Sequence, residues 1–151
     1  MRVRIEIDQN AEEEVVIHCK EWNDEAGRLQ AALEDALRQG ELPLTAGDAL
    51  CFVPIDEILF FETDGDAVKV HTRDGIYTSG EKLYRLEQML PRRFARVSKS
   101  CILNSAAVVS LSRGVTGTAV ARFSDTTKEA YVSRMYYKAL ETLIYETRVL
   151  T

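Results

Sequence analysis

Apolar and polar residues alternate along much of this chain, and the period of the alternation differs between segments. Residues 2–8 alternate apolar with charged side chains, and residues 15–19 form a second apolar segment, as is typical of β-strands. Residues 26–37 instead carry apolar side chains at helical spacing, after Asn23 or Asp24 as the candidate N-cap. The pattern predicts a β-β-α element at the N-terminus.

Beyond Leu42 the pattern changes to short strands separated by turn signals, of which Asp64-Gly65-Asp66 and Asp74-Gly75 are the clearest. The expected strands cover residues 49–53, 57–63, 68–72, 76–77, 94–97, 101–103, 108–111, 115–123 and 129–132. They do not alternate regularly with helices, as the strands of a parallel sheet would. These observations predict a mainly β fold, built as an antiparallel sheet or sandwich.

Two helices are expected within this β-rich part. Thr78, with Glu81 three residues later, has the spacing of a capping box, and Pro91 ends the apolar stripe that follows. Ser133 is placed to cap a final helix. The body is therefore expected to be a β-rich α+β domain with small helices.

Charge divides the chain at nearly the same place as the change in pattern. Residues 1–50 hold 5 basic and 12 acidic residues, whereas residues 92–138 hold 9 basic and 2 acidic residues. We therefore predict an N-terminal extension over residues 1–41 and a separate domain over residues 42–151. A basic stretch in an otherwise acidic protein suggests a nucleic-acid-binding face, and the acidic extension would repel phosphate.

The composition narrows the class of protein further. The apolar runs are only a few residues long, whereas a membrane helix needs about 20, and charges near the N-terminus interrupt any signal-peptide core. We therefore expect a cytoplasmic protein. The three cysteines are widely spaced and odd in number, which argues against a disulfide framework or a metal site. We expect reduced thiols and no cofactor.

The sequence RRFARVSKSCILN (residues 92–104) places four cations within eight residues, directly before an apolar segment. One interpretation is a solvated basic edge that keeps a strand from aggregating. The other is a loop that meets DNA phosphates and bases, held in place by the strand that follows it.

Four segments in a fixed order decide between these interpretations. The segments IDEILFFETDGDAVKVHTRDG, EKLYRLEQML, FARVSKSCILN and YVSRMYYKAL resemble the LytTR domain, the DNA-binding output module of bacterial response regulators of the LytR/AlgR type. The resemblance runs from about residue 42 to about residue 145. It implies an elongated antiparallel β-sandwich with small helices, which reads double-stranded DNA through loops in successive major grooves.

The resemblance also assigns contacts by position. The base-reading residue of the third segment falls on Lys99, and a second contact falls on Arg134, at the expected start of the last helix. A third contact would come from residues 64–69, where two aspartates leave Lys69 as the plausible donor. Arg92 and Arg93, which directly follow Pro91, are expected to meet phosphates or water. The full expected DNA-binding set is Lys99, Arg134, Arg96, Ser98, Ser100, Lys69, Arg92 and Arg93.

Most regulators of this type carry a receiver domain ahead of the DNA-binding module, and the front segment here is too short for one. The chain therefore resembles a stand-alone form, some members of which are regulated by a membrane-bound protein. With few base-reading side chains per module, we expect a homodimer on direct-repeat half-sites. Leu29, Leu33 and Leu37 form a candidate dimer surface. No small-molecule substrate is expected.

Several alternatives remain open at this stage. The chain could be a protein-interaction module whose acidic N-terminal segment engages a regulatory partner. An enzyme is disfavoured, because neither histidine has an evident link to Cys101 and no carboxylate pair is spaced to share one site. Arg134 could form an intramolecular ion pair, and Cys101 could sense oxidation because cations lie near it in the sequence.

Overall fold

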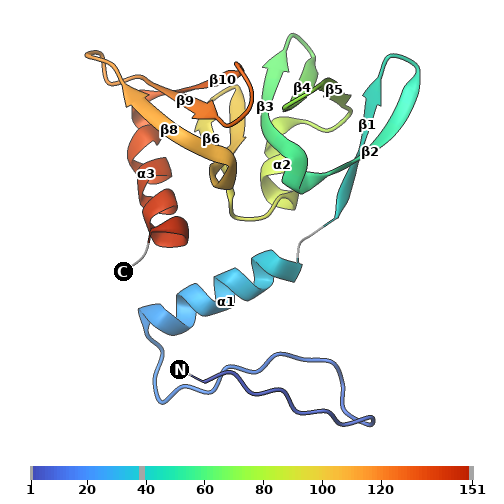
Figure 1. The fold of residues 1–151 in the computed structure, drawn as a ribbon, viewed down its shortest axis with the longest axis vertical. Coiled ribbons are helices and arrows are strands. Elements are labelled where there is room, and N and C mark those ends of the chain that lie inside the picture. Colours follow the sequence, from blue (N-terminus) through green and yellow to red (C-terminus); the bar gives the residue numbers. More distant parts are fainter. Residues whose placement is uncertain (1, 38–39, 150–151) are drawn as a thin grey trace.

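The computed structural model describes residues 2–37 and 40–149, which form two antiparallel sheets and three α-helices (Figure 1). The helices are α1 (Asp24–Leu37), α2 (Leu83–Met89) and α3 (Arg134–Arg148). The strands are β1 (Glu41–Ala46), β2 (Ala49–Pro54), β3 (Ile58–Asp64), β4 (Ala67–Thr72), β5 (Ile76–Ser79), β6 (Phe94–Ser98), β7 (Cys101–Asn104), β8 (Val108–Arg113), β9 (Ala119–Phe123) and β10 (Glu129–Val132). The predicted β-rich, antiparallel fold is confirmed.

The larger sheet has seven strands in the order β2-β1-β5-β4-β3-β7-β6, and the smaller sheet has the order β10-β9-β8. Strand β3 lies inside the larger sheet and is covered on both faces. Phe61 belongs to a core that α2 closes with Leu86, whereas Phe60 belongs to a second core with Phe123 of β9 and Leu140 of α3. Covering both faces explains why the start of β3 is apolar without alternation.

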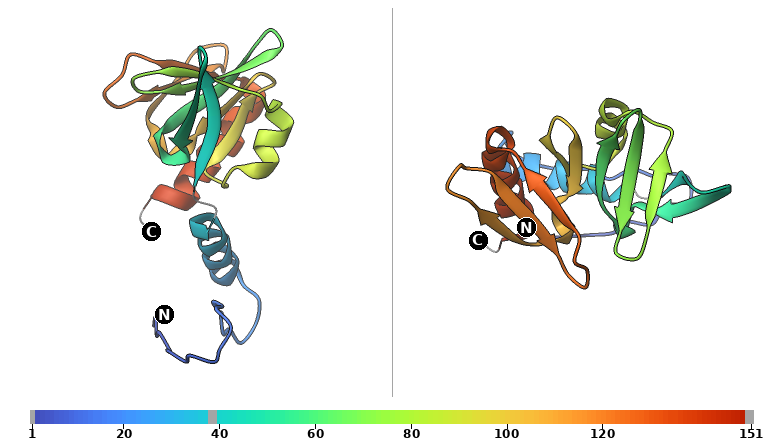
Figure 2. Two further views of the ribbon diagram at one scale, coloured as in Figure 1. Left: turned by 90° about the vertical axis from the view of Figure 1, so that its right-hand side faces the viewer. Right: turned by 90° about the horizontal axis from the view of Figure 1, so that it is seen from above.

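The N-terminal strands were predicted wrongly. The described residues before α1 contain no strand, and Figure 2 shows this segment and α1 extending away from the two sheets. A two-stranded ribbon is only marginally stable in water, and in the described part of the chain Val3, Ile5 and Ile7 remain exposed. The helix itself lies where predicted, because the Asn23 side-chain oxygen accepts a hydrogen bond from the Ala26 amide at 2.9 Å.

The expected helix caps are also partly wrong. Thr78 lies in β5 rather than at a helix start, and Ser79 Oγ accepts a hydrogen bond from the Glu81 amide before α2 begins. Ser133 is the N-cap residue of α3, but its side chain makes no capping bond. Its backbone carbonyl instead accepts from the amides of Tyr136 and Tyr137 at 3.0 and 3.1 Å.

Strand β1 was missed from the sequence, because it carries a proline in its interior. Pro43 lies opposite Phe52, and β1 pairs along its length with β2 and at Thr45 with β5. The sheet therefore begins at Glu41, one residue before the expected boundary. The expected strand over residues 115–123 begins only at Ala119.

Candidate nucleic-acid interface

The tight turn between β6 and β7 is shaped by one guanidinium group. Arg96 donates to the backbone carbonyls of Ser98 at 2.9 Å and Lys99 at 2.6 Å, and it pairs with Glu87 at 2.8 Å. The Ser100 amide donates to Ser98 Oγ at 3.2 Å and closes the turn. The Lys99 side chain is left exposed at the tip. Arg96 therefore positions the turn, and Lys99 is the residue presented by it.

Two backbone hydrogen bonds join this turn to segments that are distant in the sequence. The Thr63 amide, at the end of β3, donates to the Ser100 carbonyl at 2.9 Å. The Ser133 amide, directly before α3, donates to the Val97 carbonyl at 2.8 Å. The β3–β4 turn, the β6–β7 turn and the start of α3 therefore form one continuous edge, which is at the top of Figure 1.

Arg134 is the first residue of α3, and its aliphatic stem lies against the β8–β9 loop. A Cβ on Gly117 of that loop would stand 2.7 Å from Arg134 Cδ, so only glycine allows this approach. Gly117 also has a φ of 86°. Arg113, at the end of β8, stacks on the Tyr137 ring at 4.6 Å and adds a cation that the sequence reasoning did not single out. Its position within the basic stretch was the available signal.

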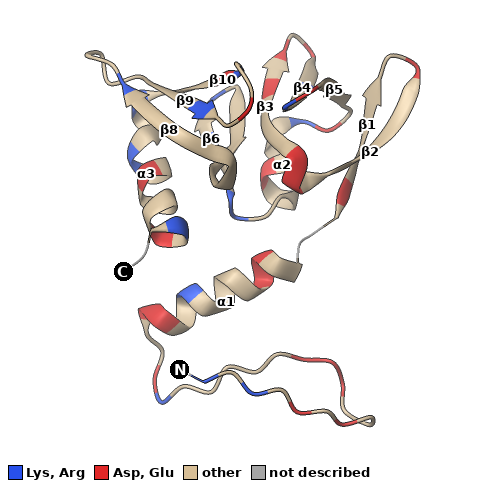
Figure 3. Ribbon diagram, in the orientation of Figure 1, with Lys and Arg blue, Asp and Glu red and all other residues tan. Residues whose placement is uncertain are grey.

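The β3–β4 turn contributes acidic rather than basic side chains to this edge. Asp64 and Asp66 are exposed at this turn. Figure 3 colours the acidic positions of β3 and of the turn after it red. Lys69 lies further along β4, directly opposite Glu62, and its ammonium group donates to Thr78 Oγ1 at 3.2 Å. Lys69, the expected third contact, therefore lies away from the edge, and its ammonium group is already hydrogen-bonded to Thr78 of the neighbouring strand β5.

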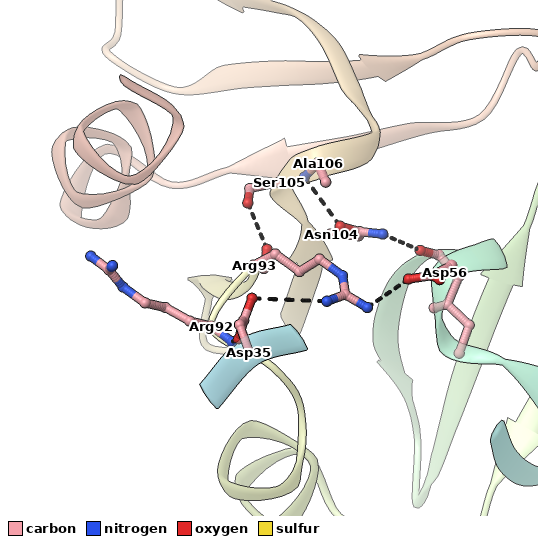
Figure 4. Close-up of polar contacts among 8 residues, drawn as sticks. Asp35, Asp56, Arg92, Arg93, Asn104, Ser105 and Ala106 are labelled. Carbon is pink, nitrogen blue, oxygen red and sulfur yellow. Dashed lines mark hydrogen bonds and ion pairs between the residues drawn. The ribbon is translucent and has the colours of Figure 1, made fainter. Parts of the chain in front are cut away.

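Arg93 lies at the opposite end of β6 and is engaged inside the protein (Figure 4). Its guanidinium group pairs with Asp56 at 2.6 Å and with Asp35 of α1 at 3.8 Å, and only 16% of its side chain is exposed. Its backbone carbonyl accepts from the Ser105 amide and hydroxyl, both at 2.7 Å. These contacts tie α1, the larger sheet and the start of β8 together.

Arg92 is engaged at the same end. Its guanidinium group pairs with Glu146 of α3 at 2.7 Å, and its amide donates to Asp35. The five residues of β6 span about 16 Å, which separates these two arginines from the β6–β7 turn. The four cations that are adjacent in the sequence therefore do not form a single loop. Of the four, Lys99 alone is exposed without an ion pair in the described part of the chain.

Three reactive side chains near the edge, Glu62, His71 and Cys101, lie close together. Glu62 lies opposite Cys101 and accepts a 2.7 Å hydrogen bond from His71, a link that was not evident in the sequence. Burial raises the pKa of the Cys101 thiol to about 12, so the thiol stays protonated. Burial lowers the pKa of His71 despite the Glu62 contact. This chemistry argues against redox sensing at Cys101.

No group of three or more potential metal ligands occurs among residues 2–37 and 40–149. Within the same ranges, no helix has the length and apolar character needed to cross a membrane.

Comparison with known proteins identifies a family of DNA-binding domains. Residues 48–145 match the family model of the LytTr DNA-binding domain. The uncharacterized HTH-type transcriptional regulator SAB2242 of Staphylococcus aureus is 25% identical over 142 residues, 93% of this chain and 96% of that protein. The sensory transduction protein LytT of Bacillus subtilis is 30% identical over 108 residues, which are 71% of this chain but only 44% of LytT.

A solved LytTr DNA-binding domain from Bacillus cereus has the same fold, with a TM-score of 0.65 and 20% identity over 70% of this chain and 96% of that domain. The helix-turn-helix in the names of the staphylococcal relatives has no counterpart here, because strands separate the three helices along the described residues. The matches support a DNA-binding transcriptional regulator rather than an enzyme. The chain belongs to the LytTr DNA-binding domain family.

Proposed function

We propose that this protein regulates transcription by binding double-stranded DNA with the edge that carries the β6–β7 turn and the start of α3. One observation carries the proposal: the exposed Lys99 and Arg134 lie on segments that backbone hydrogen bonds hold together. Neither side chain has an ion pair or hydrogen bond within the described residues, so both can meet a ligand without losing an internal partner.

The residues at this edge have different roles in the proposal. Lys99 donates to guanine O6 or N7, and Arg134 makes a bidentate contact to guanine or phosphate. The hydroxyls of Ser98 and Ser100, which lie 3.3 Å apart, contact the backbone of the DNA. Arg96 fixes the turn from behind.

The proposal also narrows the set expected from the sequence. Arg92 and Arg93 are left out, because they lie at the other end of β6 and their charges are paired. Lys69 is left out because it lies within β4, between β3 and β5, and its ammonium group donates a hydrogen bond to Thr78. Arg113 is added as a phosphate contact, since its guanidinium group lies over Tyr137, which is about one helical turn after Arg134 in α3.

We further propose that two protomers occupy two half-sites in direct repeat. Two base-reading side chains give discrimination of about 1–3 kcal/mol for each good bidentate contact, which is too little to single out one genomic site. Two protomers double this discrimination. The arrangement in direct repeat is carried over from the family resemblance.

Selection of bound sequences from a random DNA pool tests the proposal, followed by affinity measurements on the enriched site. Arg134→Ala and Lys99→Ala should each weaken the enriched site by about 1–3 kcal/mol and relax the preference at particular bases. Lys138→Ala is the matched control, because Lys138 lies one turn along α3 and is 85% exposed. Its ammonium group pairs with Glu141 at 3.1 Å, so its removal should leave the affinity for selected and random DNA nearly unchanged.

Two results would contradict the proposal. The first is a selection that enriches no sequence. The second is an equal loss on selected and random DNA for Arg134→Ala and Lys99→Ala, which would make both residues phosphate contacts only.

A second candidate function is a protein-interaction module whose acidic N-terminal segment engages a regulatory partner. The exposed apolar residues of that segment favour it, with Val3 at 94% and Ile7 at 92% exposure. A membrane-bound regulatory protein is a partner that the family resemblance implies. A failed DNA selection together with capture of such a protein by the full chain would favour this function.

A further inference from the structure

Residues 2–8, here called the arm, have the pattern of a strand but pair with no strand among the residues that the structure describes. The chain reverses direction directly after it, since the Ala11 amide donates to the Asp8 carbonyl at 3.2 Å. The turn of a β-hairpin is thus present, but the described residues on its two sides do not form paired strands. The apolar side of the arm faces solvent, with exposures of 94% for Val3, 83% for Ile5 and 92% for Ile7.

The charges of the arm are arranged symmetrically in position and oppositely in sign about Ile5. Arg4 and Glu6 lie one residue to either side of it, and Arg2 and Asp8 lie three residues to either side. An antiparallel pair of identical arms centred on Ile5 therefore places Arg4 opposite Glu6 and Arg2 opposite Asp8. Directly opposite residues point to the same face, so every charged pair joins opposite signs.

The apolar residues follow the same symmetry. In this register Val3 lies opposite Ile7, and Ile5 lies opposite itself, on the face away from the charges. In the single chain, Arg4 pairs with Glu6 of its own strand, two residues away on the same face. Pairing with a second arm would offer the same two groups partners on an adjacent strand.

We propose that the arm pairs antiparallel with the arm of a second copy of this chain, with Ile5 on the two-fold axis. The inference deepens the dimer part of the proposed function by naming the surface that joins the protomers. A two-fold interface must be complementary to itself, and the charge pattern of the arm meets that condition.

Neighbouring registers are disfavoured by the same charges. Centring the pair on Arg4 brings two arginines together, and centring it on Glu6 brings two glutamates together. A one-residue slip places charged side chains opposite apolar ones. Parallel pairing in register places every charge beside its equal. The sequence thus specifies a single alignment of two arms.

The chain after the turn supplies the rest of a stable sheet. Residues 15–19 run back from the turn and leave Val15 and Val16 exposed, at 67% and 55%. In the register that the turn sets, Val16 lies opposite Val3, whereas Glu12 and Glu14 lie opposite Ile7 and Ile5. Two hairpins joined through their arms give a four-stranded sheet in which the two arms are the inner strands and carry the apolar face. Three or more strands with such a face are needed for independent stability, which explains why one hairpin alone does not form.

Exchanging charges between positions 4 and 6 tests the alignment without DNA. Sedimentation and native mass spectrometry of the full chain should show a dimer for the unaltered protein. Arg4→Glu alone should be monomeric, because two like-charged pairs form by symmetry, and so should Glu6→Arg alone. An equimolar mixture of these two variants should form a one-to-one heterodimer. The double variant, Arg4→Glu with Glu6→Arg, should dimerise with itself.

Glu21→Arg is the matched control, since it reverses an exposed charge outside the arm and should leave the dimer intact. A wild-type monomer at about 100 μM would overturn the inference and leave the apolar face to a different partner. Dimers of either single variant, or a mixture that stays monomeric, would overturn the alignment.

The same variants separate this inference from the proposed function. Arg4→Glu should bind a single half-site as well as the unaltered protein does and lose only the added affinity for two half-sites. A chain that dimerises as expected but enriches no DNA sequence would refute the proposed function and leave the arm pairing standing.

Discussion

The two ends of strand β6 carry similar charges and use them in different ways. Before the strand, Arg93 is largely buried and pairs with acidic groups from α1 and from the loop before β3. After the strand, Lys99 is exposed on a turn whose carbonyls are held by Arg96. One end uses cations to join parts of the protein, and the other presents a cation to the outside.

The difference lies in the partners rather than in the cations. Asp35 and Asp56 reach Arg93 from positions far away in the sequence, and they satisfy its charge internally. Near Lys99 the exposed neighbours on the β3–β4 turn are acidic, but the structure gives them no ion pair with it among the described residues. A run of positive charge in a sequence therefore does not by itself mark a nucleic-acid contact.

The largest effect on stability is expected at the internal end of β6. Arg93→Ala should lower the free energy of unfolding by about 2 kcal/mol, because it leaves two carboxylates without their shared cation. This loss of free energy is smaller than that expected for a fully buried ion pair, because Asp56 is 67% exposed. Urea unfolding of the full chain measures it, and DNA affinity of the folded variant should be unchanged.

Arg92→Ala is the matched control, since Arg92 is half-exposed and makes one surface ion pair. Its unfolding free energy should stay within about 0.5 kcal/mol of the unaltered protein. Loss of DNA affinity in Arg93→Ala at unchanged stability would reverse the roles of the two ends.

A smaller effect is expected from the residue that shapes the presenting end. Arg96→Ala should weaken binding to the selected DNA by about 1 kcal/mol, or roughly fivefold, because the turn loses two hydrogen bonds to its carbonyls. Arg96→Lys should not restore the affinity, since one ammonium group cannot reproduce the fork. Titration of labelled DNA at fixed salt measures both.

Glu87→Ala distinguishes the two kinds of contact that Arg96 makes, its hydrogen bonds to backbone carbonyls and its ion pair with Glu87. It removes the carboxylate that pairs with Arg96 but leaves the two carbonyl contacts in place. Affinity for the selected DNA should therefore be nearly unchanged or slightly higher. A loss equal to that of Arg96→Ala would mean that the ion pair, and not the carbonyl contacts, holds the turn.

The smallest effect on stability is expected from His71, which lies in β4 and hydrogen-bonds to Glu62 of β3. Burial lowers its pKa below the usual 6.5, so the unfolded chain takes up a proton at a higher pH than the folded protein. This contribution to stability is complete above pH 6.5 and is lost as the pH falls towards the lowered value. His71→Gln should flatten that part of the stability profile, whereas the exposed His18→Gln should not.

The sequence was sufficient for the parts of the fold that local pattern determines. The strands from β2 to β10 and the helix that starts beside Ser133 lie close to their predicted positions, because alternation and turn residues act over short distances. Lys99 was likewise expected on a turn, and it lies on one. The resemblance to the LytTR family supplied the DNA-binding expectation that the charges alone left open.

The remaining differences arise from contacts that no local pattern contains. Arg93 was expected on DNA because its acidic partners are 37 and 58 residues away in the sequence. The strand expected over residues 2–8 has the right alternation but no neighbouring strand within residues 2–37 and 40–149. The reverse holds for β1, where pairing on both sides produces a strand despite Pro43.

Two backbone hydrogen bonds join the β3–β4 turn, the β6–β7 turn and the start of α3, and they affect the entropy of DNA binding. The Thr63–Ser100 and Ser133–Val97 hydrogen bonds fix the spacing of the turns before any DNA arrives. In the proposed mode of binding, association orders little protein backbone, and the entropic cost falls on the flexible side chains of Lys99 and Arg134. A preformed edge also cannot adapt its spacing, so a DNA site whose grooves differ must deform to fit. Base pairs that no side chain touches would then contribute to selectivity through their stiffness.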